Sequence, residues 1–559
     1  MKQTLEVQLG AVVRQLFGVE VDAQLTRPEE QFGDYATNVA LQLSKKLGKN
    51  PREISEALAV KLREILADQV SEVSVAGPGF INLKLSGKAL INTLTVKPAK
   101  SLQGQSIVAE YSDPNPFKVL HAGHLYTSLV GDAVANLMEY AGAKVHRVNF
   151  GGDVGLHVGK TVWAVINELG GEHPEKLANI PDEAKLDWIS QRYVTGNTAY
   201  DENESAKQAI IAANKRVYEL HDSNDHNSPF AKIYWICRQW SYDGFDALYE
   251  RLKMAPFEKY YPESAVADLG LATVKKHIGS VYKESDGAVI FRGEEYGLFT
   301  QVFINSEGLP TYAGKDVGLI YQKYQDFAPD RSFIITDAAQ KDHLAVVMKS
   351  ISLYAPKLVA TTTHYTHGQI KMAGGIKMSS RKGNILRASD ILEAAAETAK
   401  ELFEKENLDT VLAAVRYAFL KNRIGGNIIY DPAESVSLEG NSGPYLQYAH
   451  ARARSILRKV DDSKNPKSGI SDELEAGERS LARKIGEYPE VVNQAVAELM
   501  PHYVCTYLYE LAQVFNRFYE DNRVIGDPRE AWRLELVSHY ANTLKEGLKI
   551  LGIAAPDRM

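Results

Sequence analysis

The chain has 559 residues, more than one hydrophobic core usually supports, so its length predicts about three or four domains. With 45% hydrophobic residues, 24% charged residues and a formal net charge of −7, any nucleic-acid footprint must be a local patch. The two cysteines, Cys237 and Cys505, argue against a disulfide framework or a zinc site and favour a reducing cytoplasm. No apolar run reaches the roughly 20 residues of a membrane span, and the N-terminal stretch MKQTLEVQLG does not resemble a secretory signal.

The first part of the chain, residues 1–101, is predicted to form a small α+β domain. SEALAVKLREILADQ has apolar residues at helical spacing, and VSEVSVAGPGFINLKLS alternates as two strands do around a Gly-Pro-Gly turn.

A nucleotide-binding sheet domain is predicted over residues 102–389. QSIVAEYS is typical of a buried parallel strand, HLYTSLVGDAVANLMEYAGA of a helix and KVHRVNF of a second strand, which together make a β-α-β unit. The stretch from about 156 to 294 is rich in helices and polar loops and is interpreted as a helical insertion. Strand-like runs resume with GAVIFR, TQVFIN and SFIIT, and residues 390–559 are predicted to be almost wholly helical.

Two histidines, His121 and His124, stand where the first strand of this sheet domain leads into its helix. They could merely be polar residues at the start of the helix, one of them capping it; a zinc site is disfavoured because no further ligand lies nearby. Residues three apart share one face of the first helical turn, and helix N-termini at the ends of such strands hold phosphates. With Gly123 allowing close approach, the pair is suited to donate hydrogen bonds to a polyphosphate.

A short basic run, KMSSRKGN at 377–384, follows the flexible MAGG. By itself such a run is usually solvated surface. Together with the upstream His-Ala-Gly-His, it resembles the HIGH and KMSKS signatures of the class I aminoacyl-tRNA synthetases. That resemblance implies that the first motif binds ATP and that the second closes over the pyrophosphate.

Further stretches resemble the arginyl-tRNA synthetase family along most of the chain. These stretches are GDYATNVALQLSKKLGKNP, AGPGFINLKL, EYSDPNPFKVLHAGHL, RVNFGGDVG, GLPTYAGKDVGL, GPYLQYAHARARSILRK, YLYELAQVFNRFYE and the terminal APDRM. An arginine site must surround a guanidinium with carboxylates and an aromatic wall. Glu110 at a strand end, with Tyr312 and Asp316 four apart on one helix face, meets that requirement, although each is individually an ordinary strand-end or helix-surface residue.

The resemblance assigns roles to individual residues. The arginine contacts it implies are Glu110, Asn115, Tyr312, Asp316 and Gln340. The ATP contacts it implies are His121, Gly123, His124, Gly152, Asp153, Lys377, Met378 and Ser379. The catalytic set is expected to be His121, His124, Lys118, Lys377 and Arg381, with no protein side chain acting as a metal ligand.

The sequence departs from the family pattern at three positions. Asp113 stands where the family often has serine, Val154 replaces a tryptophan, and Ser380 stands where the second lysine of KMSKS belongs. Since that lysine supplies positive charge to the leaving pyrophosphate, another must compensate. Lys118, three residues before His121, is the favoured candidate, and Lys382 is its rival.

The resemblance implies an α/β protein: a Rossmann-type class I synthetase catalytic domain, an N-terminal α+β tRNA-binding domain and a C-terminal α-helical, anticodon-binding bundle. The expected activity is that of an arginine–tRNA ligase, a cytoplasmic monomer that uses ATP and Mg²⁺, L-arginine and tRNA(Arg). Two alternatives remain: a different nucleotidyltransferase with the same histidine motif, whose members are typically small, and a synthetase paralogue that has lost catalysis and only binds RNA.

Overall fold

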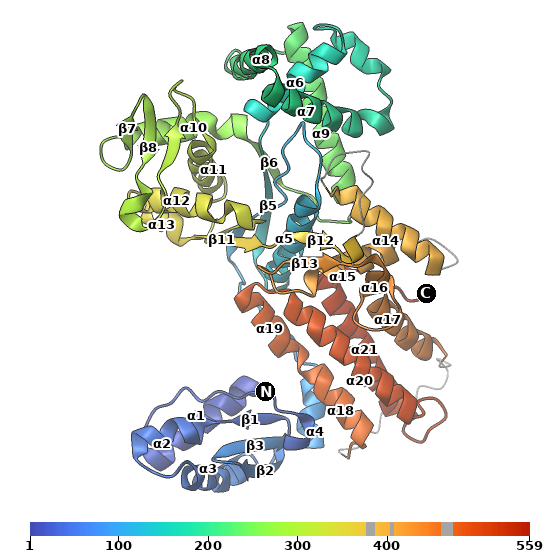
Figure 1. The fold of residues 1–559 in the computed structure, drawn as a ribbon. Helices are drawn as coiled ribbons and strands as arrows, with labels where there is room; N and C mark the ends of the chain where they lie inside the picture. The colour runs from blue at the N-terminus through green and yellow to red at the C-terminus, as the bar shows by residue number, and fades with distance from the viewer. Residues whose placement is uncertain (376–385, 403–406, 460–472) are drawn as a thin grey trace.

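The computed structural model describes residues 1–375, 386–402, 407–459 and 473–559. At its centre lies a five-stranded parallel sheet with the strand order β11-β10-β4-β5-β6 (Figure 1). Its strands are β4 (Ser106–Glu110), β5 (Lys144–Gly151), β6 (Lys259–Pro262), β10 (Arg331–Asp337) and β11 (Thr362–His367). The chain runs from β4 to β5 and β6 on one side and later returns to place β10 on the other. The strand order therefore reverses at β4, which is where doubly wound sheets bind ligands.

The predicted β-α-β unit is confirmed as β4, α5 (Ala122–Tyr140) and β5. Helix α5 is buried around most of its circumference. It packs against the sheet on one side and against C-terminal helices on the other, so its sequence is apolar on more than one face.

Helices α6 to α9 separate β5 from β6 and form a satellite with its own hydrophobic core at the top of the view in Figure 1. They are α6 (Leu156–Glu168), α7 (Lys185–Glu202), α8 (Glu204–Asp222) and α9 (Pro229–Arg251). The interpretation of 156–294 as one helical insertion was wrong in its second half, because β6 returns to the central sheet. The four residues of β6 are too few to be recognised from periodicity.

Beyond β6 the chain builds a second satellite beside the sheet. It contains α10 (Glu263–Lys276), β7 (Lys283–Ser285), β8 (Ala288–Phe291), β9 (Gln301–Ile304), α11 (Tyr312–Phe327), α12 (Lys341–Ser352) and α13 (Pro356–Ala360). The strand-like runs GAVIFR and TQVFIN are strands, but they pair antiparallel in a separate sheet of order β7-β8-β9. Helices α10 and α11 pack closely where Gly270, Gly314 and Gly318 meet without side chains.

The N-terminal unit is a three-stranded antiparallel sheet of order β1-β3-β2 with helices against it. Its elements are α1 (Lys2–Phe17), β1 (Tyr35–Thr37), α2 (Val39–Leu47), α3 (Pro51–Ile65), β2 (Val70–Ala76), β3 (Phe80–Leu85) and α4 (Gly87–Thr93). The predicted domain limit at residue 101 falls in the connection between α4 and β4.

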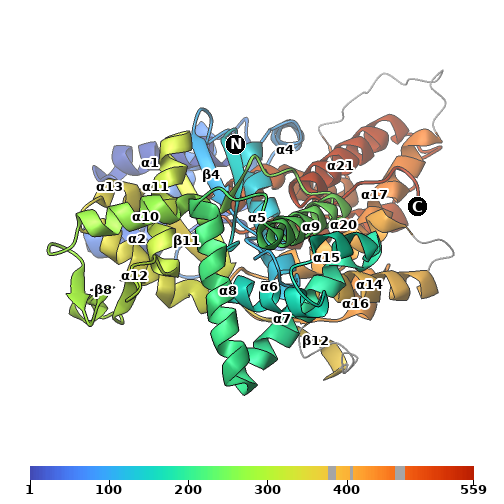
Figure 2. The same ribbon diagram turned by 90° about the horizontal axis from the view of Figure 1, so that it is seen from above.

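The C-terminal part is almost wholly helical, as predicted, apart from β13 (Ile428–Tyr430), which pairs with β12 (Ile370–Met372). Its helices are α14 (Ala388–Leu402), α15 (Leu408–Leu420), α16 (Pro432–Val436), α17 (Gly443–Arg458), α18 (Ala476–Gly486), α19 (Tyr488–Glu498), α20 (His502–Asp521) and α21 (Glu530–Ile550). Helices α14, α15, α19 and α21 pack against α5 (Figures 1 and 2), and α18 lies next to α4 of the N-terminal unit (Figure 1). In the described part of the chain, no helix combines the length and apolar character of a membrane span. The predicted fold class is confirmed.

Candidate active site

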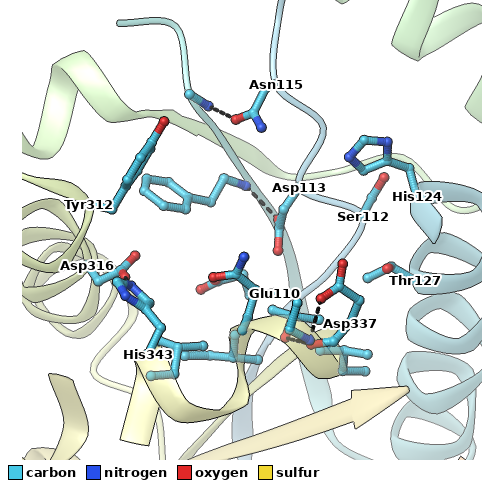
Figure 3. A pocket seen from close by; sticks show the side chains of 18 of the residues that line it. Glu110, Ser112, Asp113, Asn115, His124, Thr127, Tyr312, Asp316, Asp337 and His343 are labelled. Atoms are coloured by element: carbon cyan, nitrogen blue, oxygen red, sulfur yellow. Dashed lines mark hydrogen bonds and ion pairs between the residues drawn. The ribbon is translucent and has the colours of Figure 1, made fainter. Parts of the chain in front are cut away.

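A cavity of about 550 Å³ lies at the carboxyl ends of β4 and β10 (Figure 3). The predicted site residues that line it are Glu110, Asn115, Lys118, His121, Gly123, His124, Gly152, Tyr312, Asp316 and Gln340. They come from four separate stretches of chain, 110–124, 152, 312–316 and 340, which the topology of the sheet brings together. The predicted loop residues Lys377, Met378, Ser379 and Arg381 fall outside the described residues, as do Ser380 and Lys382.

The two histidines cap helix α5 with their Nδ1 atoms. Nδ1 of His121 accepts a hydrogen bond from the Gly123 amide (3.1 Å), and Nδ1 of His124 accepts one from the His121 amide (3.3 Å). Burial lowers the pKa of both imidazoles, which favours their neutral forms. In a neutral ring whose Nδ1 accepts, the proton sits on Nε2. The rings stack with centroids 3.8 Å apart, so the site contains two adjacent Nε2–H donors.

The chain immediately after the KMSSRKGN run is attached to this motif. Leu386 accepts a hydrogen bond from the Ala122 amide (2.7 Å), and the Ala388 amide donates to Leu120 (2.9 Å). Arg387 is fixed by ion pairs to Asp390 and to Asp187 of α7. The two sequence motifs, far apart along the chain, therefore share a boundary in the fold.

Asp153 does not line the cavity, unlike its neighbour Gly152. Its fully buried carboxylate accepts from Ser264 at the start of α10 (2.8 and 2.9 Å) and pairs with Arg238 of α9 (3.0 Å). Because the carboxylate is fully buried among these partners, it is not presented to the cavity. The structure thus speaks against the predicted ATP role of Asp153 and gives it the role of joining the insertion to the end of β5.

Three carboxyl groups, from Glu110, Asp113 and Asp316, line the cavity; we call them the carboxylate cluster. Glu110 forms a buried ion pair with Lys323 of α11. Asp316 accepts a hydrogen bond from Nε2 of His343 (2.5 Å). Asp113 accepts from the Phe150 amide (2.8 Å), and burial, followed by the nearby charge of Glu110, raises the pKa of Asp113 well above its usual range.

The remaining predicted arginine contacts frame this cluster. Tyr312 begins helix α11 one turn before Asp316 and is 55% exposed at the rim, as Figure 3 shows. The Oδ1 atom of Asn115 accepts from the Gly152 amide (2.8 Å), which leaves its amide nitrogen available to the cavity. A Cβ at Gly152 would lie 2.5 Å from that oxygen, so a side chain there would displace Asn115.

Several lining residues were missed from the sequence, among them Glu263, Asp337 and His343, together with the Lys323 that pairs with Glu110. Helical spacing could have identified Lys323, because it lies seven residues after Asp316 and therefore on the same face of the helix. His343 follows Gln340 by three residues and had the same kind of signal. Glu263 had none, because β6 was not recognised and its carboxyl end could not be placed.

The fold and the site define a class I aminoacyl-tRNA synthetase. A family model described as tRNA synthetases class I (R), catalytic domain, matches residues 87–435. Models described as Arginyl tRNA synthetase N terminal domain and DALR anticodon binding domain match residues 2–85 and 446–559.

The chain belongs to the arginyl-tRNA synthetase family. A protein of Synechococcus sp. named arginine–tRNA ligase is 31% identical over 569 residues, covering 95% of this chain and 94% of the relative. Another of that name from Phocaeicola vulgatus is 26% identical, with full coverage of both chains. Among solved structures, Thermus thermophilus arginyl-tRNA synthetase has the same fold, with a TM-score of 0.79, 24% identity and full coverage of both chains.

Proposed function

We propose that this chain activates L-arginine with ATP and transfers the arginyl group to the 3′ end of tRNA(Arg), releasing AMP and diphosphate. The main support is that an acidic cavity containing the carboxylate cluster opens directly onto the two Nε2–H donors of His121 and His124. A cationic amino acid and a nucleotide phosphate would meet there. The names of the relatives agree with this assignment.

In the proposed complex, Glu110 and Asp316 pair with the guanidinium, and the ring of Tyr312 covers it. Asn115 and Gln340 hydrogen-bond to the amino acid's own ammonium and carboxylate. The carboxylate is then directed toward α5, where the histidines lie.

ATP is proposed to lie across the start of α5. A second hollow of about 280 Å³ shares His121, Gly123, Asp337 and Ala339 with the main cavity and continues along 367–370 to Leu386. It offers room for the nucleoside on the side of the triphosphate away from arginine. An arginine carboxylate oxygen attacks the α-phosphorus, and the bond to the diphosphate oxygen breaks. The two Nε2–H groups and Lys118 then stabilise the charge that develops on the phosphates.

Mg²⁺ is proposed to accompany ATP and to neutralise its phosphates. Among the described residues, no group of three or more His, Cys, Asp or Glu side chains is placed to hold a metal ion. Mg²⁺ commonly binds through substrate phosphates and water with one or two protein carboxylates, and the lining residue Asp337 is a suitable carboxylate. We further propose that the enzyme acts as a monomer in the cytoplasm.

The test is arginine-dependent exchange between ATP and labelled pyrophosphate, with and without tRNA(Arg), followed by aminoacylation of the tRNA. L-Citrulline, a neutral isostere of arginine, and L-lysine serve as matched substrates. We expect exchange with arginine alone among the three. Binding of tRNA(Arg) without exchange or aminoacylation would identify the inactive RNA-binding paralogue instead.

A further inference from the structure

The protein places a positive charge of its own next to Glu110, just outside the lining of the acidic cavity. Lys323 of α11 forms an ion pair with Glu110 of β4, and the two side chains are only 2% and 4% exposed. A buried lysine of this kind is expensive to desolvate and is found only where a partner compensates for it. Its placement therefore calls for an explanation beyond the packing of α11.

The surroundings of Glu110 are unusually negative. Asp113 and Asp316 are close enough to act electrostatically on it and on each other, while the Tyr261 hydroxyl of β6 donates to Asp326 (2.6 Å). Figure 3 shows Asp113 and Asp316 entering the cavity from opposite sides. Asp113 stands where the family often has serine, so this chain has one more carboxyl group in the cluster. Carboxylates that share a site cannot all ionise unless a cation is present.

We propose that Lys323 is a positioning residue for substrate recognition: it is a built-in counter-ion that fixes Glu110 and favours the ionised form of that carboxyl group before arginine arrives. The inference rests on the proposed function and adds a residue to it. Lys323 donates to Oε2 of Glu110 and does not itself line the cavity, so Glu110 keeps a second carboxylate oxygen for the substrate. Glu110 is then held in place to pair with a guanidinium, and its charge is opposed less strongly by burial than it would be without Lys323.

A rival model, in which Lys323 competes with the substrate, predicts the opposite effect on arginine binding. If Lys323 only competed with arginine for Glu110, removing it would strengthen arginine binding. If Lys323 is the counter-ion, removing it raises the pKa of the buried carboxyl groups, and arginine must then displace protons to bind. The two models predict changes of opposite sign in the KM for arginine.

The experiment compares wild type with Lys323→Met and Lys323→Arg, using arginine-dependent pyrophosphate exchange in the presence of tRNA(Arg). For Lys323→Met we expect the KM for arginine to rise at least about tenfold at pH 7.5, the usual effect of stranding a charged hydrogen-bond partner. We expect this KM to fall more steeply than that of wild type as the pH is raised from 6.5 to 9. Lys323→Arg should restore most of the affinity.

Lys357→Met, which removes an exposed lysine of α13, is the matched control and should leave the KM unchanged. If Lys323→Met does not fold, Lys323→Gln retains a hydrogen bond to Glu110 without the charge and is expected to show the same rise and pH dependence. An unchanged or lowered KM, or a raised KM with the pH dependence of wild type, would overturn the proposal. Absence of arginine activation by the wild type would instead contradict the proposed function.

Discussion

At the scale of single residues, the chemistry of His121 and His124 depends on which ring nitrogen remains available to the substrate. Both Nδ1 atoms are used as acceptors within the first turn of α5, so only Nε2–H can reach the substrate. Replacing either histidine with alanine should slow adenylate formation by roughly two to three powers of ten, as loss of one transition-state donor does. Single-turnover adenylate formation measures this. A variant that keeps the wild-type rate would exclude that histidine from phosphate stabilisation.

Lys118 is predicted to compensate for the serine in KMSSR. It lines the same cavity as His121, and burial lowers the pKa of its ammonium, so its charge is only partly screened by water. Lys118→Ala should be severely defective in adenylate formation, whereas Lys382→Ala should be nearly normal. The double variant Lys118→Ala with Ser380→Lys should recover much of the rate, because the charge returns to the same phosphates. A silent Lys118→Ala would make Lys382 the better candidate.

At the scale of secondary-structure elements, helix α5 depends on a glycine against the sheet. An ideal Cβ at Gly131 would lie 2.2 Å from Cγ of Tyr111, whose ring is fully buried. Alanine favours a helix over glycine by only about 1 kcal/mol, while overpacking a core costs about 1–3 kcal/mol. We expect the cost of the steric clash to exceed the gain in helix propensity, because the fully buried ring of Tyr111 cannot move aside. We expect Gly131→Ala to lower the free energy of unfolding by about 2 kcal/mol in urea titrations.

The matched control for Gly131→Ala is Gly10→Ala in α1, where the nearest atom to the new Cβ is 3.9 Å away. Only the higher helix propensity of alanine acts there, so the free energy of unfolding of this variant should rise by about 0.5–1 kcal/mol. If both variants gained stability, the close contact between α5 and Tyr111 would be wrong.

Helix α6 contains a histidine that makes stability depend on pH. Nε2 of buried His157 donates to the Gly152 carbonyl (2.7 Å), and its Nδ1 has no partner among the described residues. Burial lowers the pKa of His157 to about 3. Since the folded state resists protonation, the stabilising contribution is complete above about pH 6.5 and is lost progressively toward pH 3.

At pH 5 the expected loss from His157 is about 2 kcal/mol, from the 1.36 kcal/mol associated with each pH unit below the unfolded pKa. His157→Gln retains a donor but cannot titrate, so its free energy of unfolding should fall less than that of wild type between pH 7.5 and 5. Parallel pH profiles for the two proteins would show that His157 is not responsible.

At the scale of the whole molecule, ion pairs hold the N-terminal unit against α18 and α19. Arg27 binds Glu490 through two nitrogens (2.7 and 3.2 Å), and the Tyr35 hydroxyl donates to the same carboxylate (2.7 Å). Asp34 pairs with Arg479 and Arg483 of α18. These contacts fix the position of one end of the chain relative to the other.

Glu490→Ala strands the Arg27 side chain, which is only 11% exposed, and should cost about 2–3 kcal/mol. The loss should appear as a lower urea midpoint and as a larger radius of gyration in small-angle scattering before unfolding. Glu520→Ala removes an exposed carboxylate from α20 and should change stability by no more than about 0.5 kcal/mol. Equal behaviour of the two variants would argue against docking through Glu490.

Local patterns in the sequence determined much of this protein. The β-α-β unit around His121 and His124, the strand pair of the N-terminal unit and the helical C-terminal part were all predicted, because apolar periodicity and turn residues act over a few neighbours. The helical spacing of Tyr312 and Asp316 was predicted for the same reason. Motif resemblance supplied the family.

Only the tertiary structure decided how distant segments meet. It returned β6 to the sheet, separated β8 and β9 from it, buried Asp153 against Arg238 and paired Glu110 with Lys323, more than two hundred residues away. The sequence defines the charge and the hydrogen-bonding capacity of each side chain. Its partner is chosen by strand pairing and helix packing between remote segments, and those depend on the energy of the whole fold.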